Sequence, residues 1–276
     1  MTEQASAAAR AQRPPVGRNG AAGREEAVFE RIEAFRRRKP RLLDEVVTLA
    51  HGAGGKASAA LLEAVFLPAF SNEALEAGTD AAIVKLGSGE RLALSTDSFV
   101  VKPLRFPGGS LGHLAVHGTV NDLSMMGARP IALAAGFVIE EGLSIGELRQ
   151  IVADMAEAAA GAGVDIVTGD TKVVDRGAAD GVFVTTTGVG LVPPGRELSA
   201  ARVTEGDAVL CSGPIGDHGV AVMLARGDLA LDADISSDTA PLSGLVEKLI
   251  SAAPSTRWLR DATRGGVGTV CNELAR

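Results

Sequence analysis

Five aspartates each end a predicted strand or open a loop of small residues, and this pattern limits what the chain can fold into. They are Asp80, Asp97, Asp122, Asp170 and Asp261. Carboxylates among Gly, Ser and Thr suit a hard divalent cation and the phosphates that it carries. Small neighbours also let backbone N–H groups approach phosphate oxygens. We therefore expect the fold to gather these aspartates, spread along the chain, into one nucleotide site.

Length and composition are those of a globular protein. The chain has 276 residues, of which 46% are hydrophobic and 22% charged, enough for one large domain or two ordinary ones. Aromatic residues make up only 3%, which argues against stacking platforms for nucleic acid. The apolar run at residues 131–139 is too short to span a membrane, and no signal-peptide pattern is present. We predict a cytoplasmic protein that binds neither nucleic acid nor membrane.

Charge is distributed unevenly along the chain. Residues 1–41 contain ten Lys or Arg and five Asp or Glu, whereas the remainder contains 17 and 29. We predict that residues 1–23 are disordered, that residues 24–39 form a short helix, and that Pro40 ends it. The acidic remainder is unsuited to binding nucleic acid.

Apolar periodicity predicts alternating helices and strands after Pro40. Pro193-Pro194-Gly195 is the best candidate for a domain boundary, which gives a basic arm at residues 1–41, a first domain at 42–193 and a second at 194–276. The arrangement is typical of an α+β or α/β protein with two domains. We expect helices at residues 59–70, 111–126, 144–160, 218–229 and 241–252 and after Gly266, and strands at 82–86, 91–96, 131–139, 165–168, 182–192 and 208–212.

Several short motifs carry possible chemistry, each with a plainer alternative. The Gly-rich loop HGAGGK at residues 51–56 could cap phosphates, although it lacks the Walker A spacing, and could equally be a turn. GDTK at residues 169–172 places a carboxylate, a hydroxyl and an amine at a strand end. GPIGDHG at residues 213–219 fits a phosphate loop or a helix cap.

Histidine and cysteine give weaker signals. His113 and His117 have the i, i+4 spacing of zinc ligands, but no third ligand is placed to help, so they are better read as core or surface histidines. Cys211 lies in a predicted apolar strand and Cys271 in a predicted apolar helix. We expect both thiols to be buried, and the pair forms neither a CxxC motif nor a disulfide framework.

Seven segments together resemble the hydrogenase maturation factor HypE, in order, from Val47 to Arg276. The resemblance implies an α+β fold like aminoimidazole ribonucleotide synthetase, whose first domain dimerises through its sheet, here with an incomplete second domain. It also implies an ATP- and Mg²⁺-dependent dehydratase that converts a cysteine S-carboxamide into a thiocyanate, with a carbamoyltransferase and hydrogenase iron-scaffold maturation proteins as partners. The segments are HGAGGK, STDSFVVKPLRFPGG, GTVNDLSMMGA, GFVIEEGL, VTGDTKVVDRG, SGPIGDHG and LRDATRGGVG.

The same resemblance implies roles for individual residues. Four aspartates match metal and phosphate positions: Asp80, Asp97, Asp122 and Asp261. Lys56 matches the lysine of the Gly-rich loop and joins Asp97 and Asp122 as a catalytic candidate. Nucleotide contacts are implied for the remaining four candidates: Asn121, Asp170, Thr171 and Lys172.

One departure concerns the C-terminus. The family ends in a Pro-Arg-Ile-Cys tail whose cysteine carries the substrate, whereas this chain stops at Arg276 within a predicted helix. We therefore expect impaired self-cyanation. Two alternatives stay open: a small-molecule kinase or synthetase of the same superfamily, and a non-catalytic remnant that binds a partner.

Overall fold

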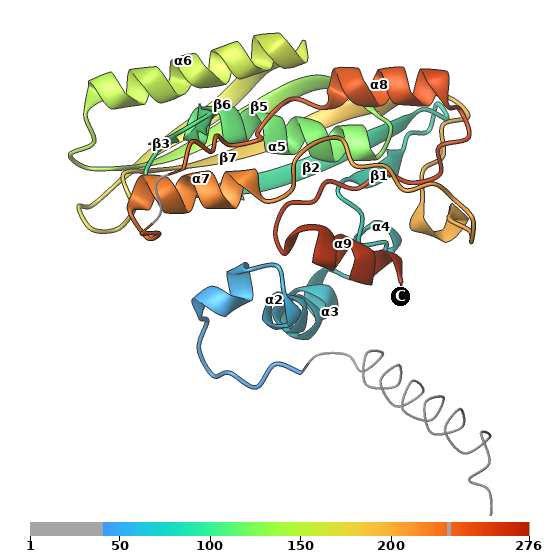
Figure 1. Ribbon diagram of the computed structural model, residues 1–276, viewed down its shortest axis with the longest axis horizontal. Helices are drawn as coiled ribbons and strands as arrows, with labels where there is room; N and C mark the ends of the chain where they lie inside the picture. Colours follow the sequence, from blue (N-terminus) through green and yellow to red (C-terminus); the bar gives the residue numbers. More distant parts are fainter. Residues whose placement is uncertain (1–40, 231–232, 276) are drawn as a thin grey trace, which may run out of the picture.

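The structure is a computed structural model that describes residues 41–230 and 233–275 (Figure 1). The segments predicted as disordered, residues 1–23, and as a short helix, residues 24–39, lie outside the described residues. A five-stranded sheet has the order β1-β2-β7-β5-β6. Its strands are β1 (Ala82–Lys85), β2 (Arg91–Phe99), β5 (Arg129–Glu140), β6 (Asp165–Val174) and β7 (Val182–Val192). A small hairpin is formed by β3 (Arg105–Phe106) and β4 (Gly109–Ser110).

The sheet is mixed. β6 pairs in parallel with β5, while the pairs β1–β2, β2–β7 and β5–β7 are antiparallel. A parallel pair needs a long crossover, which helix α6 (Ile145–Ala162) supplies between β5 and β6. β7 alternates buried with less buried residues along its length, as expected for a strand covered on one face. This arrangement confirms the α+β prediction.

Two helices cover one face of the sheet. α5 (Leu111–Met125) contacts β2, β5 and β7, and α6 packs against α5. Ser144 caps α6 because its hydroxyl accepts a hydrogen bond from the Glu147 N–H at 3.0 Å, and Gly163 ends the helix with a φ of 67°. The main core lies between these helices and the sheet and includes Leu111, Val116, Val120, Leu133, Ile151, Met155, Val182 and Val184.

The helix expected at residues 59–70 forms in three pieces. α2 (Lys56–Leu61) continues into a π-helical turn, η2 (Leu62–Phe66), and then α3 (Leu67–Phe70). Pro68 lies at the start of α3 and has no N–H to bond to the preceding turn, which explains the irregular hydrogen bonding before it. A 3₁₀ turn, η1 (Leu49–Gly52), precedes these pieces and α4 (Glu73–Glu76) follows them.

The described residues after β7 form helices and no strand. It contains η3 (Ala200–Arg202), α7 (Asp217–Arg226), α8 (Ser243–Ala252) and α9 (Gly266–Leu274). α8 lies against α5, where Val246 and Ile250 pack with Met125. Among the described helices, none combines the length and apolar character that a membrane crossing requires.

The strand predicted at residues 208–212 is wrong. This segment has no regular structure, and Val209 and Leu210 are 90% and 77% exposed. An apolar run forms a strand only where another strand can pair with it, and none in the described chain lies beside this one. The predicted burial of both thiols is also wrong, because Cys211 lies in this segment and Cys271 lies on an uncovered face of α9; both are exposed.

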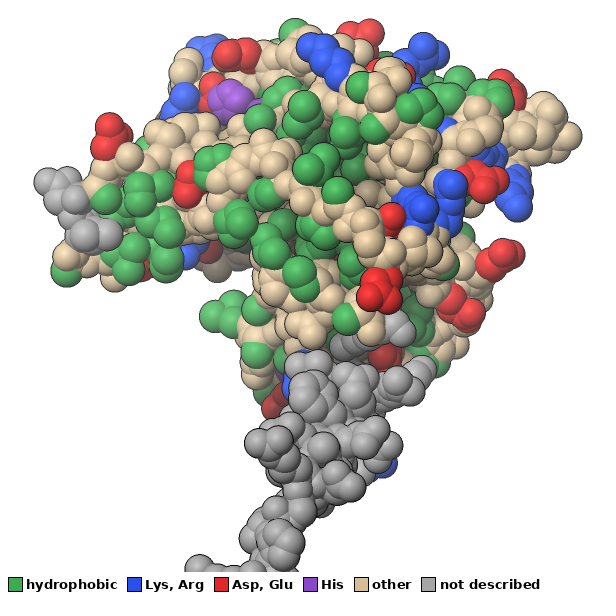
Figure 2. Space-filling model, turned by 45° about the vertical axis from the view of Figure 1, so that its right-hand side comes forward, with side chains coloured by type: hydrophobic (Ala, Val, Ile, Leu, Met, Phe, Trp, Pro, Cys, Tyr) green, Lys and Arg blue, Asp and Glu red, His purple; other side chains and the backbone are tan. Residues whose placement is uncertain are grey.

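Large apolar side chains are also exposed elsewhere. Figure 2 shows hydrophobic side chains across the middle of one face, with charged side chains mostly toward its edges. On the sheet, Leu94 of β2 is 43% exposed and Ile131 of β5 is 50% exposed, while Val167 and Val173 of the edge strand β6 reach 65% and 69%. The sheet therefore presents an uncovered apolar face and an apolar edge.

Candidate active site

Three of the predicted aspartates meet in space. Asp80 lies in the loop before β1, Asp122 lies in the last turns of α5, and Asp261 lies in the loop between α8 and α9. One carboxylate oxygen from each lies within 4.8 Å of the others. These three residues are called the acidic cluster below. Among the acidic, histidine and cysteine side chains of the described residues, these three lie close enough together to hold a metal ion.

Strand β2 supplies the side of the site next to α5. Residues two apart on a strand share a face, so Ser95 and Asp97 both point toward the helix. The Ser95 hydroxyl donates a 2.5 Å hydrogen bond to Oδ2 of Asp122. Gly118 of α5 leaves room there, because a Cβ at this position would lie 2.6 Å from the Phe99 ring and 3.9 Å from Oδ2 of Asp97. Asp97 therefore lies beside the acidic cluster.

Burial and mutual repulsion disfavour the charged carboxylates. Burial raises the pKa of Asp80 to about 8, and the negative charge of Asp261 adds to the rise. Burial likewise raises the pKa of Asp122 to about 7, against the opposing hydrogen bond from Ser95. The pKa values of Asp97 and Asp261 are also raised, mainly by burial. Without a cation the site therefore holds more acidic groups than it can keep ionised at neutral pH.

Two arginines offset part of this charge. Arg260 forms ion pairs with Asp80 and, at 2.9 Å, with Glu273 of α9. Its positive charge opposes the rise in pKa of Asp80, Asp122 and Asp261. Arg264 opposes the rise in pKa of Asp97.

The Gly-rich loop contacts the same region. A Cβ at Gly54, whose φ is 78°, would lie 2.6 Å from Cβ of Arg264, so only glycine fits between the two backbones. A Cβ at Gly265 would similarly come within 3.4 Å of the Gly54 carbonyl oxygen. Lys56 follows as the exposed first residue of α2. The structure thus joins the loop at residues 51–56 to the turn that follows Asp261.

Asn121 has a structural role. Its amide nitrogen donates to the Ala240 carbonyl at 3.0 Å, and its amide oxygen accepts from the Leu242 N–H at 2.8 Å. The side chain thereby ties the segment before α8 to α5. The nucleotide contact predicted for Asn121 remains a prediction.

Asp170, Thr171 and Lys172 lie apart from the acidic cluster within the single chain. They are exposed residues of β6, and Lys172 pairs with Asp170 at 2.5 Å. Two strands, β7 and β5, separate β6 from β2, which corresponds to roughly 14 Å across the sheet. Their predicted role in nucleotide binding also remains a prediction.

The two histidines of α5 contact nearby hydroxyl groups. Nδ1 of His113 lies 3.0 Å from the Ser110 hydroxyl, and Nδ1 of His117 lies 3.0 Å from the Thr239 hydroxyl. Burial lowers the pKa of His117 to about 4, with a smaller contribution from His113, so it is neutral at physiological pH. No third metal ligand lies close to both of them among the described residues, and their reading as core or surface histidines remains a prediction.

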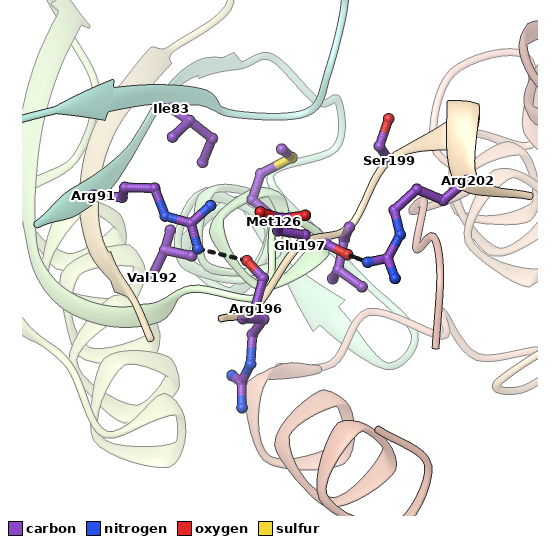
Figure 3. A pocket seen from close by; sticks show the side chains of 9 residues that line it. Ile83, Arg91, Met126, Val192, Arg196, Glu197, Ser199 and Arg202 are labelled. Atoms are coloured by element: carbon purple, nitrogen blue, oxygen red, sulfur yellow. Dashed lines mark hydrogen bonds between the residues drawn. The ribbon is translucent and has the colours of Figure 1, made fainter. Parts of the chain in front are cut away.

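A cavity of about 330 Å³ is lined in part by Ile83 of β1 and Arg91 of β2, and none of the predicted site residues lines it (Figure 3). Arg91 reaches across it and donates to the Arg196 carbonyl at 2.6 Å, and Arg202 donates to the Glu197 carbonyl. These guanidinium groups bind the backbone of the chain itself. The cavity therefore gives no reason to move the candidate site away from the acidic cluster.

Ser95, Arg260 and Arg264 are site residues that sequence reasoning did not single out. Ser95 precedes Asp97 by two positions, so strand periodicity could have placed it on the same face. The motif RDATRGG contains both arginines, but nothing in the sequence shows which carboxylates they approach. Together these groups form a carboxylate-rich site, next to a Gly-rich loop, that suits a polyphosphate with its metal ion.

The chain is similar to known proteins over most of its length. The family model for the N-terminal domain of AIR synthase related proteins matches residues 78–192. Carbamoyl dehydratase HypE of Rhodobacter capsulatus is 55% identical over 238 residues, which are 85% of this chain and 69% of that protein.

Two solved structures are similar across the same region. A chain in the crystal structure of a HypE–HypF complex is 53% identical with a TM-score of 0.73, and the match covers 78% of this chain and 70% of that one. The crystal structure of hydrogenase maturation protein HypE in complex with ATP gives 49% identity and a TM-score of 0.64, covering 83% and 68%. The chain therefore belongs to the carbamoyl dehydratase HypE family.

Proposed function

We propose that this chain catalyses the ATP-dependent dehydration of a cysteine S-carboxamide to a thiocyanate during hydrogenase maturation. The observation that carries the proposal is the acidic cluster beside the Gly-rich loop, in a chain of the HypE family. A relative's structure in complex with ATP supports the choice of nucleotide. The cytoplasmic location predicted from the sequence is part of this proposal.

The residues present fit a magnesium ion. Carboxylate oxygens are the ligands that Mg²⁺ prefers, and Asp80, Asp122 and Asp261 bring three of them within 4.8 Å of one another. Burial, with a smaller contribution from the neighbouring carboxylates, raises the pKa values of Asp80 and Asp122, and a cation placed among them would favour their ionised forms. We assign the ion to these three residues together with Asp97. Bound there, it would neutralise the charge of the nucleotide phosphates.

The proposed reaction has two chemical stages. Transfer of the γ-phosphoryl group to the amide oxygen makes that oxygen a good leaving group. Departure of phosphate and loss of the nitrogen-bound protons then leave a carbon–nitrogen triple bond. Positioning and charge neutralisation supply most of the rate in such transfers. We assign Lys56 to the phosphate oxygens, because its loop contacts Arg264 beside the acidic cluster, and Asp97 and Asp122 to the reacting end.

Calorimetry tests the site. Asp97→Asn and Asp122→Asn should each abolish Mg²⁺-dependent ATP binding while the fold stays intact, a loss on the order of a few kcal/mol. Asp207→Asn is the matched control, because Asp207 pairs with Arg257 outside the acidic cluster. ATP binding by either site variant at the parent's affinity would refute the assignment.

A second assay tests the reaction. Incubation with ATP, Mg²⁺ and a peptide that ends in a cysteine S-carboxamide should yield a product lighter by one water, detected by mass spectrometry. A stable phosphorylated product from a free small molecule would instead favour a kinase of the same fold.

We further propose that the chain forms a homodimer through its sheet. β6 is a ten-residue edge strand with exposed side chains on both faces, and natural proteins rarely leave such an edge uncovered. Leu94 and Ile131 add exposed apolar area on the sheet face opposite α5. Light scattering should give twice the mass of one chain, and a monodisperse monomer at micromolar concentration would contradict the proposal.

The other partners and the domain division are also proposals. A relative crystallised as a HypE–HypF complex supports a carbamoyltransferase partner, and we extend the partners to hydrogenase iron-scaffold maturation proteins. We place the boundary between the two domains at residues 193–194, where β7 has just ended. Pull-down of the purified partners tests the first proposal, and limited proteolysis at this boundary tests the second.

A further inference from the structure

Arg260 connects the acidic cluster to the C-terminal helix. Its Nη1 atom pairs with Oδ1 of Asp80, and its Nη2 atom lies 2.9 Å from Oε2 of Glu273 on α9. The side chain of Asp80 is only 8% exposed and that of Arg260 only 19% exposed, so solvent screens their attraction weakly. Glu273, at 38%, is the more exposed partner.

The Asp80 end of this bridge is also the end that a cation would use. Asp80 contributes one of the three oxygens that lie within 4.8 Å of one another. A guanidinium that occupies Oδ1 of Asp80 competes for the carboxylate, and its positive charge repels a dication placed beside it. The guanidinium is planar and has several N–H donors, so it can keep one carboxylate while it releases another.

We propose that Arg260 is a positioning residue that occupies Asp80 in the cation-free chain and competes with the divalent cation, and that Glu273 retains the guanidinium when Asp80 turns to the cation. This inference rests on the proposed magnesium site. The bridge stabilises the folded arrangement of the acidic cluster before the nucleotide and its metal bind. It also sets the cation affinity below what the same carboxylates would reach without the arginine.

Competition predicts effects of opposite sign in one variant. Arg260→Met should lower the melting temperature of the cation-free chain, because the carboxylates lose their neighbouring positive charge. The same change should tighten Mg²⁺ binding, on the order of tenfold, because the competitor is gone. A purely structural arginine would give the opposite result for binding, since its loss would loosen the site and weaken Mg²⁺.

Isothermal titration of the EDTA-treated chain with MgCl₂ alone, at a pH above the Asp80 pKa of about 8 so that this carboxylate is ionised, measures this affinity. Melting curves with and without MgCl₂ at the same pH supply the second readout. Arg260→Lys keeps the positive charge and should bind Mg²⁺ close to the parent's affinity. Arg257→Met is the matched control, because it removes a guanidinium and its ion pair with Asp207 from the same segment without touching the acidic cluster. Its Mg²⁺ affinity should equal the parent's.

Glu273→Gln is a second test variant, in which Arg260 is kept. Without the second carboxylate the guanidinium is held by Asp80 alone, so Mg²⁺ should bind several-fold more weakly than to the parent. This variant also covers the case in which the Arg260→Met chain does not fold without a cation, because Glu273→Gln keeps the buried ion pair with Asp80.

The outcomes separate the two proposals. Tighter binding by Arg260→Met with weaker binding by Glu273→Gln supports the competition. If the parent binds Mg²⁺ but Arg260→Met binds it equally or more weakly, or Glu273→Gln binds it equally, this inference is overturned and the magnesium site stands. A parent chain that binds no Mg²⁺, alone or with ATP, overturns the magnesium proposal and this inference with it.

Discussion

Removing the carboxylate of Asp80 should reduce the pH dependence of stability in the cation-free chain. The pKa of Asp80 is raised to about 8, mainly by burial, against about 3.9 in an unfolded chain. An acid whose folded pKa is raised binds its proton more tightly when folded. Its contribution to stability is therefore greatest below the unfolded pKa and declines as the pH rises toward the folded pKa.

The magnitude follows from the number of protons. Between about pH 5 and about pH 7 the unfolded chain has released this proton while folded Asp80 keeps it, so stability falls by about 1.4 kcal/mol per pH unit, or about 2.7 kcal/mol in all. For a chain of this size that corresponds to a decrease in melting temperature of roughly 5 to 10 °C. Asp122, whose pKa is raised to about 7, adds a second decline of the same sign.

Melting curves followed by circular dichroism in EDTA, at pH values across this range, measure the effect. Asp80→Asn should reduce the slope of stability against pH by about 1.4 kcal/mol per pH unit, which leaves the decline due to Asp122. Excess Mg²⁺ should make the parent's stability less dependent on pH. Asp207→Asn, which removes an ion-paired aspartate elsewhere, serves as the control. A parent whose stability does not fall over this range, or an Asp80→Asn slope equal to the parent's, would refute the reasoning.

Three further predictions concern surface, sheet and core. Cys211 and Cys271 are exposed, so both thiols should react with Ellman's reagent in the native chain; fewer than two would contradict their placement. Gly169→Ala should cost about 2 kcal/mol or more, because its Cβ would lie 2.2 Å from a β5 carbonyl oxygen, whereas Gly161→Ala, with nothing within 4 Å, should be neutral or stabilising in urea titrations. Ile151→Ala should cost about 2–5 kcal/mol in the same titration, and a loss below about 1 kcal/mol would contradict its full burial.

Much of the fold could be predicted because its signals are local. The strand predicted at residues 182–192 has the observed bounds, since its apolar alternation ends at two prolines. The helix after Ser144 begins at its capping serine and ends at Gly163. The strand predicted at residues 208–212 failed because strand formation depends on a partner strand, which the local sequence does not reveal.

The candidate site divides in the same way. Small residues around Asp80, Asp122 and Asp261 predicted that they serve one site, and the structure brings them together. Ion pairs such as Arg260–Asp80 link residues far apart in the chain, and no local pattern encodes that pairing. Asp170 is the opposite case. Its motif is typical of a ligand site, but within one chain it lies on the edge strand β6, away from the acidic cluster. Whether these residues bind the nucleotide stays a prediction.

The close contact between Gly54 and Arg264 has a consequence for biosynthesis. The Gly-rich loop leaves the ribosome early, but the turn against which it packs is made almost at the end of the described chain. At about 5–20 residues per second, the loop waits roughly 10 to 40 s for its counterpart. Throughout that interval the nascent chain carries the Gly-rich loop without Asp261. Nucleotide can therefore act only as a late ligand, which stabilises the site after both the Gly-rich loop and the turn at Asp261 have been made.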